Sequence, residues 1–196
     1  MILSTTSASV HEQRRYPRIR FDTLLPMRVG HQGELVAGGL ENLSLGGLMF
    51  RTDIDLMVGE TVGVEFRVFD SPLIDMPVSI ASRVGSGLYG ARFNAGPISS
   101  LLIESAIEGA IRKGKATIIT IHDREEGKLM RIVGGFTATA KNEFMHGLSR
   151  AGIAELDLSE VTRIDAEGVA LCGIAVSRYG VRLGQRSRCV EEALPG

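Results

Sequence analysis

Cysteine is scarce in this sequence and follows no pattern, since Cys172 and Cys189 are the only two and both come late in the chain. Two unpatterned cysteines argue against a disulfide framework and fit a reducing compartment. Residues 1–10 lack the basic stretch and the apolar run of a signal peptide. The longest apolar run, residues 169–176, is too short to span a bilayer. We therefore expect a cytoplasmic protein with no membrane span.

An excess of either charge is also missing. The 22 basic and 23 acidic residues give a net charge of −1, which argues against general nucleic-acid binding, because domains with that function are usually strongly basic. The four histidines are widely separated and show no metal-ligand spacing with each other or with the cysteines. No glycine-rich nucleotide loop is present either. Without a coherent catalytic set, we expect a protein that is not an enzyme and that needs no metal or cofactor.

The first half of the chain shows β-type patterning. Val62, Val64 and Phe66 alternate with glycine and polar residues, which is the period-two pattern of a half-buried strand. Six runs of this kind at close spacing predict a small barrel or sandwich. They are residues 24–29, 34–37, 47–51, 61–69, 78–84 and 89–93.

The pattern changes after Gly96-Pro97. Residues 98–112 carry apolar side chains at helical spacing, at Leu101, Leu102, Ala106, Ile107 and Ile111. Strand-like runs then alternate with helical segments, which predicts an α/β unit. The strand-like runs are 117–121, 129–133 and 153–158, and the helical segments are 137–151 and 167–179. We predict an α+β chain of two domains, with a disordered start (1–10), a β-barrel (11–96), a linking helix (97–115) and an α/β domain (116–196).

Lysine is absent from residues 1–100, whereas the same stretch holds nine arginines, four of them between Arg14 and Arg20. Arginine presents a planar fork of donors that grips a phosphate or the O6/N7 edge of guanine. Pro17 prevents a stable helix through residues 14–18, so these arginines lie on an extended arm whose shape a ligand can fix. A GC-rich genome also favours arginine over lysine, so the count alone leaves both explanations open.

A second polar segment, residues 42–47 (NLSLGG), follows at the end of a predicted strand. In extended backbone, Asn42 and Ser44 point to the same face, while Gly46 and Gly47 let a ligand approach the backbone closely. An amide and a hydroxyl can pair with a base edge or a phosphate oxygen. Taken separately, the two segments are also compatible with a solvated charge cluster and a simple turn. Together they suit an anionic ligand with guanine-like edges.

Residues 11–100 resemble a PilZ domain, the bacterial receptor for the second messenger cyclic di-GMP (c-di-GMP). The resemblance depends on an RxxxR motif, followed at the right separation by a [D/N]xSxxG motif and a closing YGARF segment. The motif positions in this chain are Arg14, Arg18, Asn42, Ser44 and Gly47. The resemblance implies a six-stranded antiparallel β-barrel that holds c-di-GMP between the arginine arm and the strand with the second motif.

The same resemblance implies a role for each motif residue. The arginines of the arm grip the guanines and phosphates, and the amide and hydroxyl of the second motif bind the opposite edge. The last glycine of that motif keeps the strand close. We therefore expect the c-di-GMP-binding residues to be Arg14, Arg15, Arg18, Asn42, Ser44 and Gly47.

Residues 155–168 resemble the strand and helix entry of a STAS domain, a family that includes antagonists of anti-sigma factors and acts by protein–protein docking. In its regulatory members a serine directly after the aspartate is phosphorylated. Here Ala166 and Glu167 follow Asp165, so a phosphorylation switch is not supported, and Asp165 is expected to cap the helix instead. Beyond that helix only residues 181–183 resemble a strand, and the remaining helices of the family are not evident, so the domain reads as incomplete.

Two functions of different class follow. In the first, the chain is a c-di-GMP receptor whose ligand orders the arginine arm and changes how the barrel meets a protein-interaction domain, residues 116–196. In the second, the α/β half is a docking or scaffold regulator, and the barrel is degenerate and binds no ligand.

Overall fold

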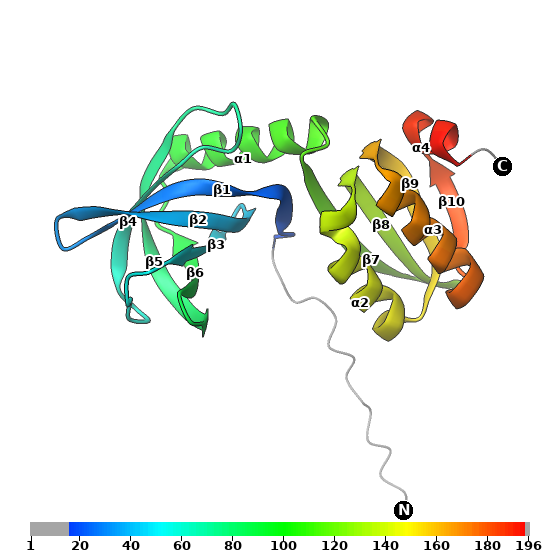
Figure 1. Cartoon of the computed structure of the whole chain (residues 1–196), viewed down its shortest axis with the longest axis horizontal. Coiled ribbons are helices and arrows are strands. Elements are labelled where there is room, and N and C mark those ends of the chain that lie inside the picture. Colours follow the sequence, from blue (N-terminus) through cyan, green and yellow to red (C-terminus); the bar gives the residue numbers. More distant parts are fainter. Residues whose placement is uncertain (1–15, 195–196) are drawn as a thin grey trace, which may run out of the picture.

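The computed structural model describes residues 16–194, which form two units that lie side by side (Figure 1). The first unit is a β-barrel, and the second is a sheet with helices packed on one face. A single long helix runs along the barrel toward the second unit. No helix among the residues described is both long and apolar enough to cross a membrane.

Six antiparallel strands close the barrel, as the six β-type runs and the family resemblance predicted. Around the barrel their order is β1-β2-β3-β6-β5-β4, and β1 also pairs with β4, for example at Met27 and Phe66, which closes the ring. The strands are β1 (Ile19–His31), β2 (Glu34–Ser44), β3 (Gly47–Thr52), β4 (Thr61–Phe66), β5 (Ile74–Gly85) and β6 (Leu88–Phe93).

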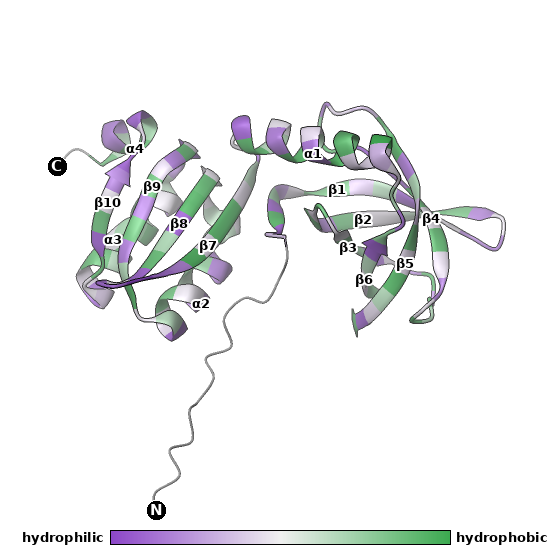
Figure 2. Ribbon diagram, turned by 180° about the vertical axis from the view of Figure 1, so that it is seen from behind, coloured by the Kyte–Doolittle hydropathy of each residue, from purple (hydrophilic) through white to green (hydrophobic). Residues whose placement is uncertain are grey.

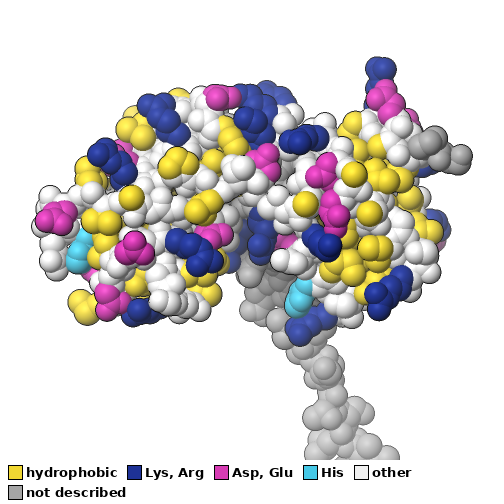
Figure 3. Space-filling model, in the orientation of Figure 1, with side chains coloured by type: hydrophobic (Ala, Val, Ile, Leu, Met, Phe, Trp, Pro, Cys, Tyr) yellow, Lys and Arg dark blue, Asp and Glu magenta, His cyan; other side chains and the backbone are white. Residues whose placement is uncertain are grey.

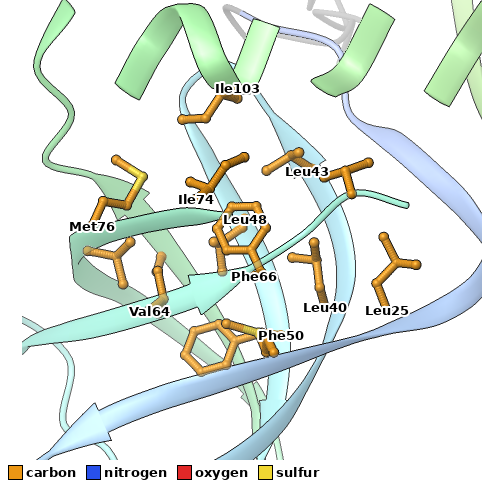
Figure 4. Packing of buried hydrophobic residues seen from close by; sticks show 14 of the residues in the cluster. Leu25, Leu40, Leu43, Leu48, Phe50, Val64, Phe66, Ile74, Met76 and Ile103 are labelled. Carbon is orange, nitrogen blue, oxygen red and sulfur yellow. The ribbon is translucent and has the colours of Figure 1, made fainter. Parts of the chain in front are cut away.

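Inward-facing apolar side chains fill the barrel. In β4, Val62, Val64 and Phe66 are buried and their neighbours are more exposed, which confirms the alternation predicted from the sequence. Figure 4 shows the cluster, in which Phe66 lies among side chains from several strands and Ile103 reaches it from the helix above. The barrel core also takes in Ala116 at the start of β7, so the second unit contributes to its edge.

Helix α1 (Pro97–Arg112) starts directly after the barrel, with Gly96 as N-cap residue and Pro97 in the first turn. Proline suits this position because its missing N–H would have no partner there. Ile103, Ala106 and Ala110 are buried against the barrel core. The sequence placed Leu101 on the packed face, but this residue is 65% exposed, because the face that packs on the barrel is centred on Ile103, Ala106 and Ala110.

The second unit contains a four-stranded sheet in the order β7-β8-β9-β10, in which β7 is antiparallel to β8 and the other neighbours are parallel. Its elements are β7 (Ala116–Arg124), β8 (Gly127–Phe136), the 3₁₀ turn η1 (Ala138–Ala140), α2 (Lys141–Ala151), β9 (Ile153–Ile164), α3 (Ala166–Tyr179), β10 (Arg182–Arg186) and α4 (Arg188–Ala193). Figures 1 and 2 show α2 and α3 on the same face of this sheet.

Aromatic and aliphatic side chains between this sheet and its helices form a second, separate core. The rings of Phe136 and Phe144 lie 5.0 Å apart, and Leu171 and Cys172 of α3 are buried beside the sheet. Cys172 is thus a core residue, as predicted, and burial raises the pKa of its thiol to about 11. Asp165 accepts a hydrogen bond from the Gly168 N–H at 2.8 Å, which confirms the predicted N-cap of α3.

The two units share one continuous sheet, a connection that the sequence did not predict. The start of β1 pairs with the start of β7, Arg20 opposite Thr117 and Phe21 opposite Ala116, so all ten strands are hydrogen-bonded in one row. The side-chain hydroxyl of Thr162 donates to the Ile111 carbonyl at 2.9 Å and adds a further tie.

Several predicted boundaries were wrong. Strand β1 begins at Ile19, five residues before the predicted start, because pairing with β2 and β7 extends it through polar residues. The run predicted over residues 61–69 ends at Phe66, and Phe69 has a positive φ of 53° in a turn. Helix α4 was missed, because six residues are too few for a helical period to be visible.

Candidate ligand-binding site

The candidate site lies where the chain enters β1 and β2 ends. Arg14 and Arg15 lie outside the residues described, so the structure places only Arg18 of the three predicted arginines. Arg18 is exposed and directly precedes β1. The part of the site that the structure describes therefore begins at Tyr16.

The β1–β2 ladder brings the two motifs together. Ile19 pairs with Leu43 and Arg20 pairs with Asn42. Ile19 and Leu43 are both buried in the barrel core, so the next pair along the ladder, Arg20 and Asn42, points away from that core. The Arg20 side chain is exposed, whereas Asn42 is covered. Arg18 lies one step beyond this paired stretch, at the Ser44 end of β2. The start of β1 and the end of β2, more than twenty residues apart in the sequence, thus lie side by side.

Asn42 carries a buried hydrogen-bond acceptor to which no residue between 16 and 194 donates. The residue is only 6% exposed, and its Nδ2 donates to the sulfur of Met49 at 3.6 Å. Its Oδ1 is buried and has no hydrogen-bond partner within residues 16–194. A buried polar atom without a partner costs about 1–3 kcal/mol. A ligand N–H or an ordered water can satisfy such an atom.

Ser44 and the two glycines form the tight turn between β2 and β3. The Ser44 hydroxyl donates to the Gly47 carbonyl at 3.2 Å. A Cβ on Gly47 would lie less than 3.0 Å from the Ala91 carbonyl oxygen, a backbone atom of β6 that cannot move aside alone. A Cβ on Gly46 would lie 3.1 Å from the Tyr16 ring, so this ring packs over the turn. Only glycine therefore fits at position 47.

Arg92 belongs to the same face and was missed at the sequence level. In the ladders, Gly47 pairs with Ser44 on one side and with Arg92 of β6 on the other. Ala91 next to it is buried, so Arg92 points out of the barrel. No side chain stands between Ser44 and Arg92, since the residue between them is glycine. The outward alternation of residues 89–93 indicated an exposed arginine, but only the strand order shows that it faces the second motif.

The second unit approaches the site from the opposite side. Nε of Arg20 donates to Oε2 of Glu143, in the first turn of α2, at 2.8 Å. Figure 3 shows a hollow between the two units that is bordered by both dark-blue Lys and Arg and magenta Asp and Glu side chains. The cationic groups among them attract an anionic ligand.

The predicted STAS-like features lie elsewhere in the second unit. Asp165 receives the N–H of Gly168 and also that of Ala138, the latter at 3.3 Å, so its carboxylate is engaged in holding the start of α3. Ala166 is the first residue of that helix and offers no hydroxyl.

Residues 16–112 are thus a closed six-stranded barrel and its following helix, with arginine, amide and hydroxyl groups gathered on one outer face. The PilZ domain family matches residues 12–112, and the chain belongs to this family. The match ends before the second unit, so the resemblance of residues 116–196 to a STAS domain stays a prediction. No curated protein matches this chain.

Three solved structures are similar over the barrel. The complex of Escherichia coli YcgR with c-di-GMP is 21% identical, over 51% of this chain and 46% of that one, with a TM-score of 0.45. The K. pneumonia MrkH–c-di-GMP complex is 17% identical, over 53% and 54%, with a TM-score of 0.44. The Bacillus subtilis inhibitor of motility MotI/DgrA is 17% identical, over 52% and 53%, with a TM-score of 0.41. This chain therefore spans about half the length of each.

Proposed function

We propose that this protein is a cytoplasmic receptor for c-di-GMP, which binds on the outer face of the barrel at the start of β1. The observation that carries the proposal is the Oδ1 of Asn42, which is buried beside Arg20 in the β1–β2 ladder and has no partner among residues 16–194. A guanine supplies the N–H donors that this acceptor lacks. Membership of the PilZ family supports the same ligand.

The groups on this face match the charges of a dinucleotide with two phosphates. Arg18, together with Arg14 and Arg15, supplies forked donors for phosphate oxygens and for the O6/N7 edge of guanine. The Ser44 hydroxyl can donate to a phosphate oxygen in exchange for its present bond to the Gly47 carbonyl. Gly47 leaves room for the ligand to lie against the backbone of the turn. Binding here requires no chemistry on the ligand, so the proposed role is recognition and not catalysis.

Calorimetric titration with c-di-GMP tests the proposal, with separate titrations of GTP and cyclic GMP as controls. We expect c-di-GMP alone to bind tightly and its affinity to fall as salt rises, because phosphate contacts are screened. The double variant Arg14→Ala/Arg18→Ala should lose at least about 100-fold in affinity, since charge-assisted hydrogen bonds contribute about 1.5–3 kcal/mol each.

Arg28→Ala is the matched control, because its guanidinium pairs with Glu65 at 3.3 Å where β1 runs beside β4, toward the other end of β1 from the candidate site. Equal affinities for the wild type, the control and the double variant would refute the role of Arg14 and Arg18 in binding c-di-GMP. Absence of any binding to the wild type would refute the receptor function itself.

We infer that the output passes through residues 116–196, by docking of a regulatory protein. The pairing of β1 with β7 supports this, because it connects the entry to the candidate site directly with the second unit. A pull-down with the full chain tests it. Partners that are recovered only with, or only without, c-di-GMP are expected for a receptor, whereas a ligand-independent set is expected for the docking regulator with a non-binding barrel.

A further inference from the structure

Arg20 occupies the position between the candidate site and the second unit. It pairs with Asn42 of β2 on one side and with Thr117 of β7 on the other. It is thus the side chain of β1 that borders both the proposed ligand and the second unit. Its guanidinium is committed to Glu143 of α2, with the donor and acceptor atoms 2.8 Å apart.

The ion pair is accessible to a competing anion. The Arg20 side chain is 50% exposed and that of Glu143 is 34% exposed. Exposed pairs of this kind contribute little to stability, because water and salt screen them. A phosphate forms stronger, forked hydrogen bonds with a guanidinium than a single carboxylate oxygen does. A dianionic ligand next to Asn42 can therefore take Arg20 away from Glu143.

We propose that Glu143 is a built-in competitor of the ligand for Arg20, and that ligand binding frees the first turn of α2. This inference rests on the proposed function, because it requires that the anion binds beside Asn42. The affinity for the ligand and the contact between α2 and β1 are then linked. Breaking the Arg20–Glu143 ion pair costs free energy, which lowers the affinity for the ligand by some factor. By reciprocity, bound ligand weakens the ion pair that holds α2 by the same factor.

The other ties between the units do not involve the guanidinium of Arg20, so the change is local to α2. Asp22 faces Arg163 of β9 at 3.8 Å, and Lys113 bonds to Asp70 of the barrel at 2.7 Å. The β1–β7 ladder adds backbone hydrogen bonds. These contacts keep the units together when Arg20 changes partner, and α2 is the element whose exposure to a protein partner changes.

The variant Glu143→Gln tests the inference because it keeps the shape of the side chain and removes its charge. We expect it to bind c-di-GMP about two- to fivefold more tightly than the wild type in calorimetry, the range set by an exposed ion pair. In an Arg20→Ala background the gain should vanish and the affinity should be lower overall. Glu167→Gln is the matched control: it removes a carboxylate that pairs with Lys141 at the same end of α2 but does not contact Arg20, and should leave the affinity unchanged.

Amide hydrogen exchange gives an independent readout. We expect c-di-GMP to speed exchange in the wild-type α2 and to leave β7 protected. Suppose that the wild type binds c-di-GMP. The competitor role of Glu143 is then refuted if Glu143→Gln gains no affinity, if Glu167→Gln gains as much, or if c-di-GMP leaves amide exchange in α2 unchanged. The receptor function stands in each of these cases. If neither the wild type nor Glu143→Gln binds c-di-GMP, the receptor function fails and the competitor with it.

Discussion

Replacement of Gly47 by alanine should damage the barrel, because the added methyl group has no free space. Its Cβ would lie less than 3.0 Å from the Ala91 carbonyl oxygen and 3.2 Å from the Arg92 Cα, both backbone atoms of the paired strand. Relief requires β3 and β6 to separate at this end. Overpacking costs about 1–3 kcal/mol, and one ladder hydrogen bond lost adds about 1 kcal/mol. For a chain of this size, about 2–4 kcal/mol corresponds to a fall in Tm of about 4–16 °C.

Scanning calorimetry of the full chain measures this change, and Gly63→Ala in β4 is the matched control. A Cβ at Gly63 meets no heavy atom within 4 Å, so that variant should melt within a few degrees of the wild type. The two variants make the same chemical change in two strands of one barrel. If both melt at the wild-type temperature, the close approach of β6 to Gly47 is not a constraint and the steric argument for this motif glycine is refuted.

Three further outcomes are expected. Arg92→Ala should weaken c-di-GMP binding about tenfold or more at unchanged Tm, in keeping with a charge-assisted hydrogen bond; unchanged affinity would remove Arg92 from the site. For Asp157, burial tends to raise the carboxyl pKa, but hydrogen bonds from Ser159 and the charge of Arg131 outweigh it and leave the pKa below its usual value. Its contribution to stability is therefore present above about pH 4 and is lost as pH falls through the lowered pKa. Asp157→Asn should melt below the wild type at pH 7, with a gap that closes toward pH 2, and a gap independent of pH would contradict this. Cys172, buried and with a thiol pKa of about 11, should resist a thiol reagent at pH 8 in the folded protein, whereas rapid labelling there would show that α3 opens readily.

Local patterns carried the prediction of the elements. The alternation around Val64 identified β4, because side chains on a strand alternate between core and solvent whatever the rest of the fold does. Pro97 marked the start of α1, and Asp165 marked the start of α3, since capping depends only on the backbone groups of one turn. The order and spacing of the two polar motifs pointed to the PilZ family, because they can be read directly from the sequence.

Contacts set by strand register could not be predicted in this way. Register shifts interrupt the pairing of β1 with β2 and of β2 with β3, and each shift changes which residues stand opposite one another. Nothing local to Arg92 says that Gly47 is its neighbour across β3 and β6. The same holds for Arg20 and Glu143, which are 123 positions apart in the sequence.

The sequence by itself determined the six barrel strands, the helices α1 to α3 and the lack of a serine after Asp165, and it predicted which side chains hold a guanine dinucleotide. These follow from properties of a few adjacent residues. Only the tertiary structure decided that the site face also includes Arg92, that the Oδ1 of Asn42 has no partner among residues 16–194, and that Arg20 is shared with α2. Those facts arise from closure of the barrel and from the pairing of β1 with β7, which join residues that are distant in the chain.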